Sequence, residues 1–326
     1  MATPRNAADT AAEKKTAAKA KGAVAAKGAA ADDDRDEAEA PAEQASSLPR
    51  LPRVTGVCSW SLQPKGIDDL IAKVRACGVS AVQLAMEPIR GRQVGWGTPE
   101  EVFGKLAEAK IRVVSGMFEP IGEDYSTLES IAYTGGLRQT KNWEANLKRA
   151  REVAKIASDA GLSLVTFHAG FLPEDPRDRL HKTMIERIEK VAQEFSSRDV
   201  LLGLETGQER AETLLETLDG IDEPLLGINF DPANMILYGM GNPNEALEEL
   251  ADYVLQVHIK DATASSTPGQ WGAEVPAGKG ETDWPRLFKF VNATLPEVNL
   301  VIEREAGDAR VADVVTARKL VEKHTK

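Results

Sequence analysis

The chain has 326 residues, of which 42% are hydrophobic and 28% are charged, and its formal net charge at pH 7 is −11. This composition suits a globular protein with a large core, and the acidic balance argues against nucleic acid as the main partner. No stretch is apolar and long enough for a bilayer span or a secretory signal, so we expect no membrane partner. Cys58 and Cys77 follow no disulfide or metal pattern, which indicates reduced thiols in a cytoplasmic protein.

The first 50 residues differ in composition from the rest. They are rich in alanine and lysine at first, then turn acidic (DDDRDEAEAPAE), and contain few large apolar side chains. Such a segment cannot bury enough apolar surface to offset the entropy of ordering it. We therefore predict a disordered tail over 1–50 and a folded domain over 51–326.

Within the domain, short apolar runs alternate with amphipathic stretches. The expected strands cover 54–60, 80–86, 111–118, 162–168, 200–206, 225–231, 253–259 and 299–305. The expected helices cover 67–78, 99–110, 142–161, 179–195, 244–251 and 284–294. Alternation of strand and helix predicts parallel strands joined by right-handed crossovers.

Eight such units in about 275 residues match the size of a (β/α)8 TIM barrel. A doubly wound open sheet is the main rival, but it usually has a glycine-rich phosphate loop after its first strand, and CSWSLQPKG is not such a loop. We therefore expect an α/β protein of the barrel type. In that fold, side chains at the C-terminal ends of different strands converge on one mouth.

Polar residues stand at the ends of five of the expected strands. They are His168, Glu205, Asn229, Asp231, His258, Glu303 and Glu305. A single acid at a strand end is commonly a helix cap or a surface ion pair. Four potential ligands on successive strands are harder to explain as caps or surface ion pairs, because crowded acids repel unless a cation neutralises them. Glu205, Asp231, His258 and Glu303 therefore predict a site for one divalent cation, with Mn²⁺, Mg²⁺ or Co²⁺ favoured and Zn²⁺ also allowed.

The motifs GLETG, NFDPANM, VHIKDA, GKGETDW and VIEREAGD together resemble the sugar phosphate isomerase/epimerase family with its xylose isomerase-like TIM barrel. The resemblance covers about residues 54 to 323. It implies that Glu205, Asp231, His258 and Glu303 hold one divalent cation, with Glu305 as the fallback for the last ligand. It also implies abstraction of a proton next to a carbonyl through an enediolate, with Glu205 and Glu303 as the acid and base that catalyse isomerisation or epimerisation of a sugar.

The expected substrate contacts come from five further residues: His168, Asn234, Lys260, Asp261 and Trp271. Many relatives carry a histidine where this chain has Asn234, and asparagine cannot transfer a proton, which leaves the choice of sugar and of reaction open. Lys260 and Asp261 would either bind substrate or orient His258. Trp271 lies in a long glycine-containing loop over 263–284, of the kind that often covers a barrel mouth. Trp60, Gln83 and Glu87 near the first two strand ends are explained equally well by packing or by a place at the rim.

Three other functions fit parts of the pattern. A lyase or hydrolase acting on a 3-keto-glycoside would use the same cation and the same proton abstraction. An abasic-site endonuclease shares the barrel, but the related family implies three zinc ions and more histidines than the four present here. A non-catalytic sugar-binding protein has no reason to keep a complete ligand set. We expect a small-molecule sugar as the partner, and a homo-oligomer is compatible with the sequence.

Overall fold

The computed structural model describes residues 52–267 and 269–325. The predicted tail over 1–50 lies outside the described residues, so its disorder and the domain boundary at 50/51 stay predictions. None of the helices in the described part is both long enough and apolar enough to cross a membrane.

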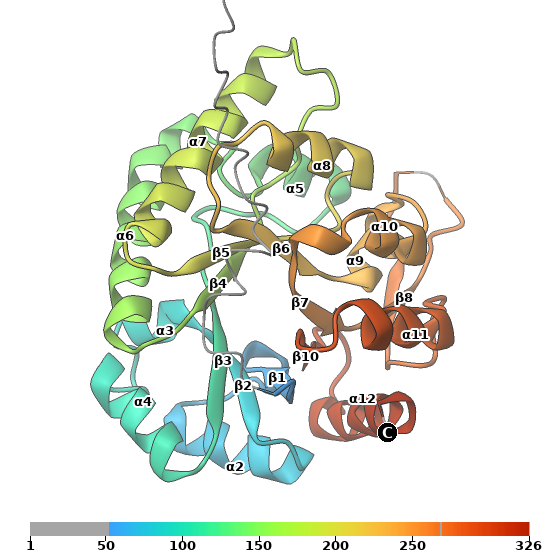
Figure 1. Cartoon of the computed structure of the whole chain (residues 1–326). Coiled ribbons are helices and arrows are strands. Elements are labelled where there is room, and N and C mark those ends of the chain that lie inside the picture. Colours follow the sequence, from blue (N-terminus) through green and yellow to red (C-terminus); the bar gives the residue numbers. More distant parts are fainter. Residues whose placement is uncertain (1–51, 268, 326) are drawn as a thin grey trace, which may run out of the picture. The chain divides into compact units, whose positions relative to one another are not determined.

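The described chain forms a closed barrel of eight parallel strands, as predicted (Figure 1). Their order around the barrel is β1, β10, β7, β6, β5, β4, β3, β2. The strands are β1 (Thr55–Cys58), β2 (Ala81–Ala85), β3 (Arg112–Met117), β4 (Leu164–Phe167), β5 (Leu201–Glu205), β6 (Leu226–Phe230), β7 (Val254–Ile259) and β10 (Asn299–Ile302). Each lies inside one of the eight predicted ranges. The barrel closes because β1 pairs in parallel with both β10 and β2.

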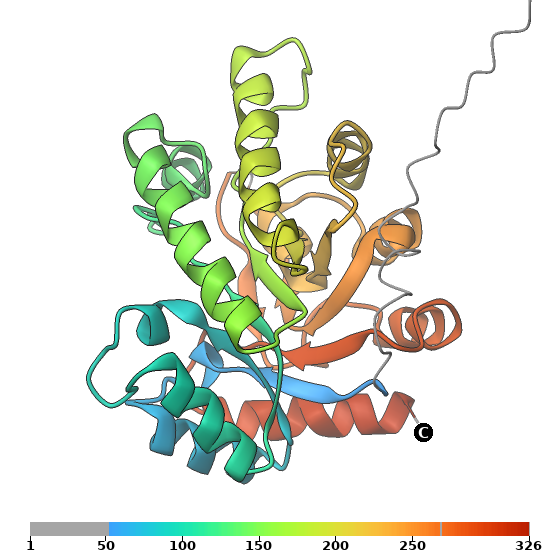
Figure 2. The same ribbon diagram turned by 60° about the vertical axis from the view of Figure 1, so that its left-hand side comes forward.

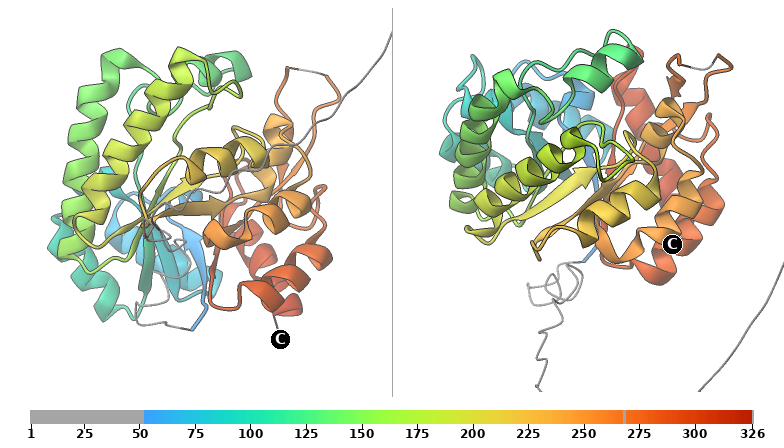
Figure 3. Two further views of the ribbon diagram at one scale, coloured as in Figure 1. Left: turned by 45° about the horizontal axis from the view of Figure 1, so that its top comes forward. Right: turned by 90° about the horizontal axis from the view of Figure 1, so that it is seen from above.

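Helices surround the strands, as Figures 2 and 3 show from three further directions. They are α2 (Ile67–Cys77), α3 (Met86–Arg90), α4 (Pro99–Glu108), α5 (Leu128–Thr134), α6 (Trp143–Asp159), α7 (Arg179–Ser196), α8 (Ala211–Asp219), α9 (Pro232–Tyr238), α10 (Pro243–Glu249), α11 (Trp284–Thr294) and α12 (Arg310–His324). Three short 3₁₀ turns occur at η1 (Trp60–Leu62), η2 (Thr140–Asn142) and η3 (Ala251–Tyr253). The six predicted helices are present, whereas α3, α5, α8, α9 and α12 were not predicted.

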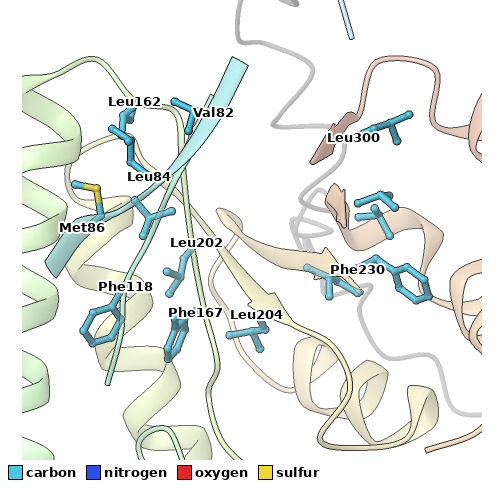
Figure 4. Packing of buried hydrophobic residues seen from close by; sticks show 14 of the residues in the cluster. Val82, Leu84, Met86, Phe118, Leu162, Phe167, Leu202, Leu204, Phe230 and Leu300 are labelled. Atoms are coloured by element: carbon cyan, nitrogen blue, oxygen red, sulfur yellow. The ribbon is translucent and has the colours of Figure 1, made fainter. Parts of the chain in front are cut away.

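The core lies between strands and helices, which explains the continuous apolar runs of the sequence. Every residue of β4, β5 and β6 is buried. Figure 4 shows Phe118, Phe167, Leu202 and Leu204 among the packed side chains of this layer. A strand covered on both faces needs apolar side chains on both, so these runs show no alternation.

A two-stranded antiparallel hairpin interrupts the long loop after β7. Strand β8 (Asp261–Thr263) pairs with β9 (Ala273–Val275). The predicted glycine-containing loop over 263–284 therefore includes part of a hairpin. The hairpin lies directly beyond β7, and its two strands connect the ends of β7 and β10, as described below.

Candidate functional site

Four side chains that were predicted as cation ligands meet at the C-terminal end of the barrel. Glu205 is the last residue of β5, Asp231 follows β6, His258 lies in β7, and Glu303 follows β10. All four are at least 95% buried. One ligand atom from each lies within 4.8 Å of those of the others, a spacing that could hold a metal ion. Glu305 lies outside this group, and its side chain is 54% exposed.

The imidazole of His258 stands at the centre of the group. Its Nδ1 lies 3.3 Å from Asp231 Oδ2, 3.4 Å from Glu303 Oε2 and 3.5 Å from Glu205 Oε1. Three carboxylate oxygens and one imidazole nitrogen therefore face a common point. Oxygen-rich sets of this kind suit Mg²⁺, Mn²⁺ or Co²⁺ and accept Zn²⁺.

Glu303 is held by hydrogen bonds to both of its oxygens. Trp60 Nε1 donates to Oε1 at 2.7 Å, and Lys260 Nζ donates to Oε2 at 2.8 Å. Burial favours the neutral carboxyl, but the charges of Lys260 and His258 outweigh it and hold the pKa of Glu303 well below its usual range. Glu303 is therefore ionised at neutral pH. Trp60, which the sequence left undecided, is part of the site.

Glu205 has one engaged and one free oxygen. Asn234 Nδ2 donates to Oε1 at 3.0 Å, and His168 Nε2 lies 3.5 Å from the same oxygen. Oε2 is buried without a hydrogen-bond partner among the described residues. Burial by itself would raise the pKa of Glu205. The charges of His168 and His258 lower the pKa by more than burial raises it, so the net shift is downward. A buried ionised oxygen without a partner is costly unless a cation or a substrate satisfies it, and this observation fits the residues to a metal ion.

Asp231 has two separate tasks. Its Oδ1 accepts hydrogen bonds from the backbone N–H groups of Ala233 at 2.8 Å and Asn234 at 3.0 Å, and so caps α9. Its Oδ2 faces His258. Burial raises the pKa of Asp231. Because Pro232 begins α9 directly after Asp231, the sequence DPAN fixes both the cap and the direction of the second oxygen.

Lys260 links the candidate ligands to the neighbouring polar residues. Besides Glu303, it donates to Glu305 Oε2 at 2.6 Å and to Asn234 Oδ1 at 3.2 Å. Burial works against the charged amine, but the surrounding carboxylates raise the pKa of Lys260 well above its usual value. The structure thus brings Lys260, Asn234 and His168 next to the four candidate ligands.

A cavity of about 250 Å³ opens beside this group. Trp60 and Tyr125 lie on its wall, and its ionisable lining residues are Glu87, Glu119, Glu123, His168, Glu303 and Glu305. Arg90 and Arg149 contact Glu87 at 2.8 and 3.3 Å. The cationic side chains described near the cavity are therefore already paired with carboxylates.

Asp261 does not face the cavity in the way a substrate ligand would. Its Oδ2 accepts from the N–H groups of Gly278 at 2.8 Å and Gly280 at 3.0 Å and from Trp284 Nε1 at 2.9 Å. Its Oδ1 accepts from the N–H of Thr282 at 3.2 Å. In this structure Asp261 fixes the segment between β9 and α11, and its contact with substrate stays a prediction.

Trp271 packs against an aromatic neighbour. Its ring centroid lies 4.9 Å from that of Tyr238, which in turn contacts Phe171 at 5.5 Å. Trp271 is not among the described residues that line the cavity. Its contact with substrate stays a prediction.

Comparison with known proteins identifies the family. The sequence model described as xylose isomerase-like TIM barrel matches residues 71–323. A curated relative, 3-oxo-isoapionate decarboxylase of Pectobacterium atrosepticum, is 31% identical over 117 residues, which is 35% of this chain. The match spans 42% of the length of that relative.

Solved structures show the same fold. A xylose isomerase domain protein from Planctomyces limnophilus superposes with a TM-score of 0.73 at 27% identity, covering 85% of this chain and 99% of that chain. A 3-keto-D-glucoside 4-epimerase from E. coli has a TM-score of 0.60 at 15% identity, covering 82% of this chain and 99% of that chain, and at this identity the likeness concerns the fold alone. Because the family model matches most of the chain, the protein belongs to the xylose isomerase-like TIM barrel family.

Proposed function

We propose that the protein is a divalent-metal-dependent isomerase or epimerase that acts on a sugar by removing a proton next to a carbonyl. One observation carries the proposal: Glu205 and Glu303, from strands β5 and β10, direct carboxylate oxygens at the same imidazole nitrogen, at 3.5 and 3.4 Å. They lie three strands apart in the barrel, and can therefore approach a bound sugar from two sides.

Glu205, Asp231, His258 and Glu303 would hold the cation, which supplies Lewis-acid stabilisation of the substrate oxygen that becomes negative as the proton leaves. Glu205 and Glu303 form the acid–base pair. One removes a proton, and the other, once it is protonated, delivers a proton to the enediolate, which gives the epimer or the neighbouring carbonyl isomer. The free Oε2 of Glu205 is suited to the first step because no described donor occupies it.

Lys260, Asn234 and His168 would bind the substrate. Asn234 Nδ2 has a second donor besides the one that it directs at Glu205. Lys260 directs its three donors at Glu303, Glu305 and Asn234, and would bind a sugar oxygen in place of the exposed Glu305. His168 lines the cavity, and its Nδ1 is buried without a described partner. A substrate hydroxyl would satisfy that nitrogen.

The charges of the cavity favour an uncharged sugar. Five glutamates line it, and Lys260, Arg90 and Arg149 are each paired with carboxylates. A phosphate or carboxylate group would have to displace one of these pairs, at a cost that an uncharged ketose or 3-keto-glycoside avoids.

The experiment is proton exchange in D₂O with Mg²⁺-loaded enzyme and a panel of ketoses, sugar phosphates and 3-keto-glycosides, followed by NMR. We expect deuterium on a carbon next to the carbonyl of an uncharged sugar. Glu205→Gln and Glu303→Gln should each reduce exchange by at least about 100-fold, as for loss of a general acid or base. Glu248→Gln, on the exposed face of α10, is the control. Full exchange in both glutamine variants would disprove the two-glutamate scheme.

The match to a decarboxylase supports a second candidate. A decarboxylase would use the same residues to stabilise an enediolate that forms when a carbon–carbon bond breaks and CO₂ leaves. A lyase would form the enediolate by proton removal, and the enediolate would then expel the leaving group as the carbon–oxygen bond breaks. The same NMR experiment, with a 3-keto acid added to the panel, separates the two candidates. A lyase or decarboxylase releases a leaving group or CO₂, whereas an epimerase leaves the carbon skeleton intact.

A further inference from the structure

His258 has two ring nitrogens with different surroundings. Nδ1 faces the three candidate carboxylate ligands, whereas Nε2 lies 2.8 Å from Oε1 of Gln83. Gln83 belongs to β2, which does not neighbour β7 in the barrel, so the contact crosses the barrel interior. Both side chains are fully buried. Two alternative cation positions exist around this ring, because Cys58 Sγ lies 3.7 Å from Nε2 and forms a second potential ligand group with His258 and Glu303.

The hydrogen bonds around Gln83 determine which end of its amide faces the ring. Gln83 Nε2 donates to Thr166 Oγ1 at 2.8 Å. Gln256 Nε2 donates to Gln83 Oε1 at 3.0 Å and to Asn229 Oδ1 at 3.0 Å. Reversing the Gln83 amide would set its NH₂ group against that of Gln256. The atom beside His258 is therefore an acceptor.

The Gln83 amide is also fixed by a backbone group. Ser115 Oγ lies 2.7 Å from Gln256 Oε1, but a hydroxyl can donate or accept. The backbone carbonyl of Gly116 can only accept, and it lies 3.5 Å from Gln83 Nε2, which directs Gln83 Oε1 towards His258 and Gln256 Nε2. Asn229 Nδ2 also approaches His258, at 3.1 Å from Nε2 and 3.4 Å from Nδ1. An atom nearly equidistant from both ring nitrogens cannot lie along the lone pair of either, because these lone pairs diverge. Gln83 is thus the in-line partner of Nε2.

An acceptor at 2.8 Å requires a proton on Nε2, both in the charged ring of the metal-free site and in the neutral ring that binds a cation. The neutral ring carries only this one ring proton. Nδ1 then has a free lone pair, directed at the carboxylates. Without Gln83, the three carboxylates would favour a proton on Nδ1, because it would donate to them. That tautomer cannot bind a cation at Nδ1.

We propose that Gln83 is a positioning residue that keeps the proton on Nε2 of His258 and so directs the cation to the Nδ1 side, away from Cys58. The proposal rests on the metal site proposed above. Ser115, Thr166, Asn229 and Gln256 set the orientation of the Gln83 amide from four other strands. The function of this buried polar layer is to choose the ligand atom of His258.

The test compares Gln83→Met, which removes the acceptor, with Gln83→Glu, which keeps an oxygen at the same position. Mn²⁺ affinity is measured by titration under EPR. Gln83→Met should weaken Mn²⁺ binding by about 10- to 100-fold, the usual effect of removing a partner of a metal-ligating histidine. Gln83→Glu should stay close to the wild-type affinity. Glu248→Gln, at an exposed position of α10, is the control and should leave the affinity unchanged.

Two further readouts concern the wild-type protein and do not depend on a variant folding. In ¹⁵N NMR of the Mg²⁺-saturated protein, the protonated nitrogen of His258 should be Nε2. The Co²⁺ form should lack a thiolate-to-cobalt charge-transfer band. Either a proton on Nδ1 or a thiolate band would overturn the proposal. Unchanged Mn²⁺ affinity in Gln83→Met would overturn it too, whereas a wild-type protein that binds no divalent cation would instead refute the metal site itself.

Discussion

Lys260 donates a hydrogen bond of 2.8 Å to the same Glu303 oxygen that faces His258 Nδ1. A fixed ammonium group and a candidate divalent cation therefore share one carboxylate. At about 4 Å and an effective dielectric constant of about 20, two such charges repel by several kcal/mol. The amine thus weakens cation binding, and at the same time it provides a fixed donor beside Glu303.

We predict that Lys260→Met separates these two effects. Mn²⁺ should bind at least about tenfold more tightly, because a repulsive charge is gone. Proton exchange on the substrate should fall by about 100-fold or more, because a donor to a substrate oxygen is lost. Lys289→Met, at an exposed position of α11, is the control. Weaker Mn²⁺ binding in Lys260→Met would contradict the shared-carboxylate interpretation.

Asp231 allows cation binding to be separated from helix capping. Asp231→Asn retains an oxygen for the N–H groups of Ala233 and Asn234 but removes the charge that faces His258. Wild-type protein should gain about 2.7 kcal/mol of stability at a cation concentration 100 times its Kd, and lose it on chelation. Asp231→Asn should fold but lose most of this gain.

The control is Asn242→Ala at the N-cap of α10, where the side chain accepts from Asn244 N at 2.9 Å. It should cost about 1 kcal/mol of stability with or without the cation. Thermal unfolding with and without EDTA gives both numbers. A cation-dependent gain that survives in Asp231→Asn would argue that the ion binds elsewhere.

The eight barrel strands could be predicted from the sequence because each is a buried apolar run with turn residues on both sides. The hairpin β8–β9 could not, because its strands have three residues each and its sequence is rich in glycine, serine and threonine. The short helices α3, α5 and α9 span less than two and a half turns, too few for a periodic pattern.

The cluster of Glu205, Asp231, His258 and Glu303 was predictable because each residue stands at a strand end. Sequence position does not reveal that backbone N–H groups from 278–282 occupy the carboxylate of Asp261. The contacts of Trp60 with Glu303 and of Gln83 with His258 join residues that are 243 and 175 positions apart. Only the closure of the barrel brings such pairs together.

Asp261 leads to a stability prediction. In Asp261→Asn, an NH₂ group replaces one carboxylate oxygen and turns against backbone N–H donors from either Gly278 and Gly280 or Thr282. The free energy of unfolding should fall by about 2–4 kcal/mol, because buried donors lose a charged acceptor. Urea denaturation measures this value. Asp252→Asn, at an exposed position, should change the free energy of unfolding by less than about 0.5 kcal/mol. If both variants changed it equally, the hydrogen bonds to the charged Asp261 carboxylate would add no stability.

Glu274, in strand β9, joins the β8–β9 hairpin to the segment that follows β10. Its carboxylate accepts from Glu305 N at 2.9 Å and Ala306 N at 3.1 Å and pairs with Arg304 at 2.7 Å. The segment that carries Glu303 is thereby tied to β9. The hairpin connects the β7 end, which carries Lys260, to the β10 end, which carries Glu303. This connection explains why the two side chains remain within hydrogen-bond distance.

The last prediction concerns Glu209, which is 8% exposed and follows β5. Burial raises its pKa from 4.5 to about 8. The folded protein therefore holds this proton more tightly than the unfolded chain does. The resulting stability is fully present below pH 4.5 and is lost as the pH rises to about 8. The loss is at most about 5 kcal/mol, because one pKa unit corresponds to about 1.4 kcal/mol.

Glu209→Gln mimics the protonated side chain at every pH. In metal-free protein, urea denaturation should give similar stability for the variant and the wild type at pH 5, and a more stable variant at pH 8. Glu212→Gln, exposed on α8, should follow the wild-type curve. If Glu209→Gln and wild type instead lose stability in parallel from pH 5 to 8, ionisation of Glu209 does not lower the free energy of unfolding. The buried position would then have to open or take up water when the side chain ionises.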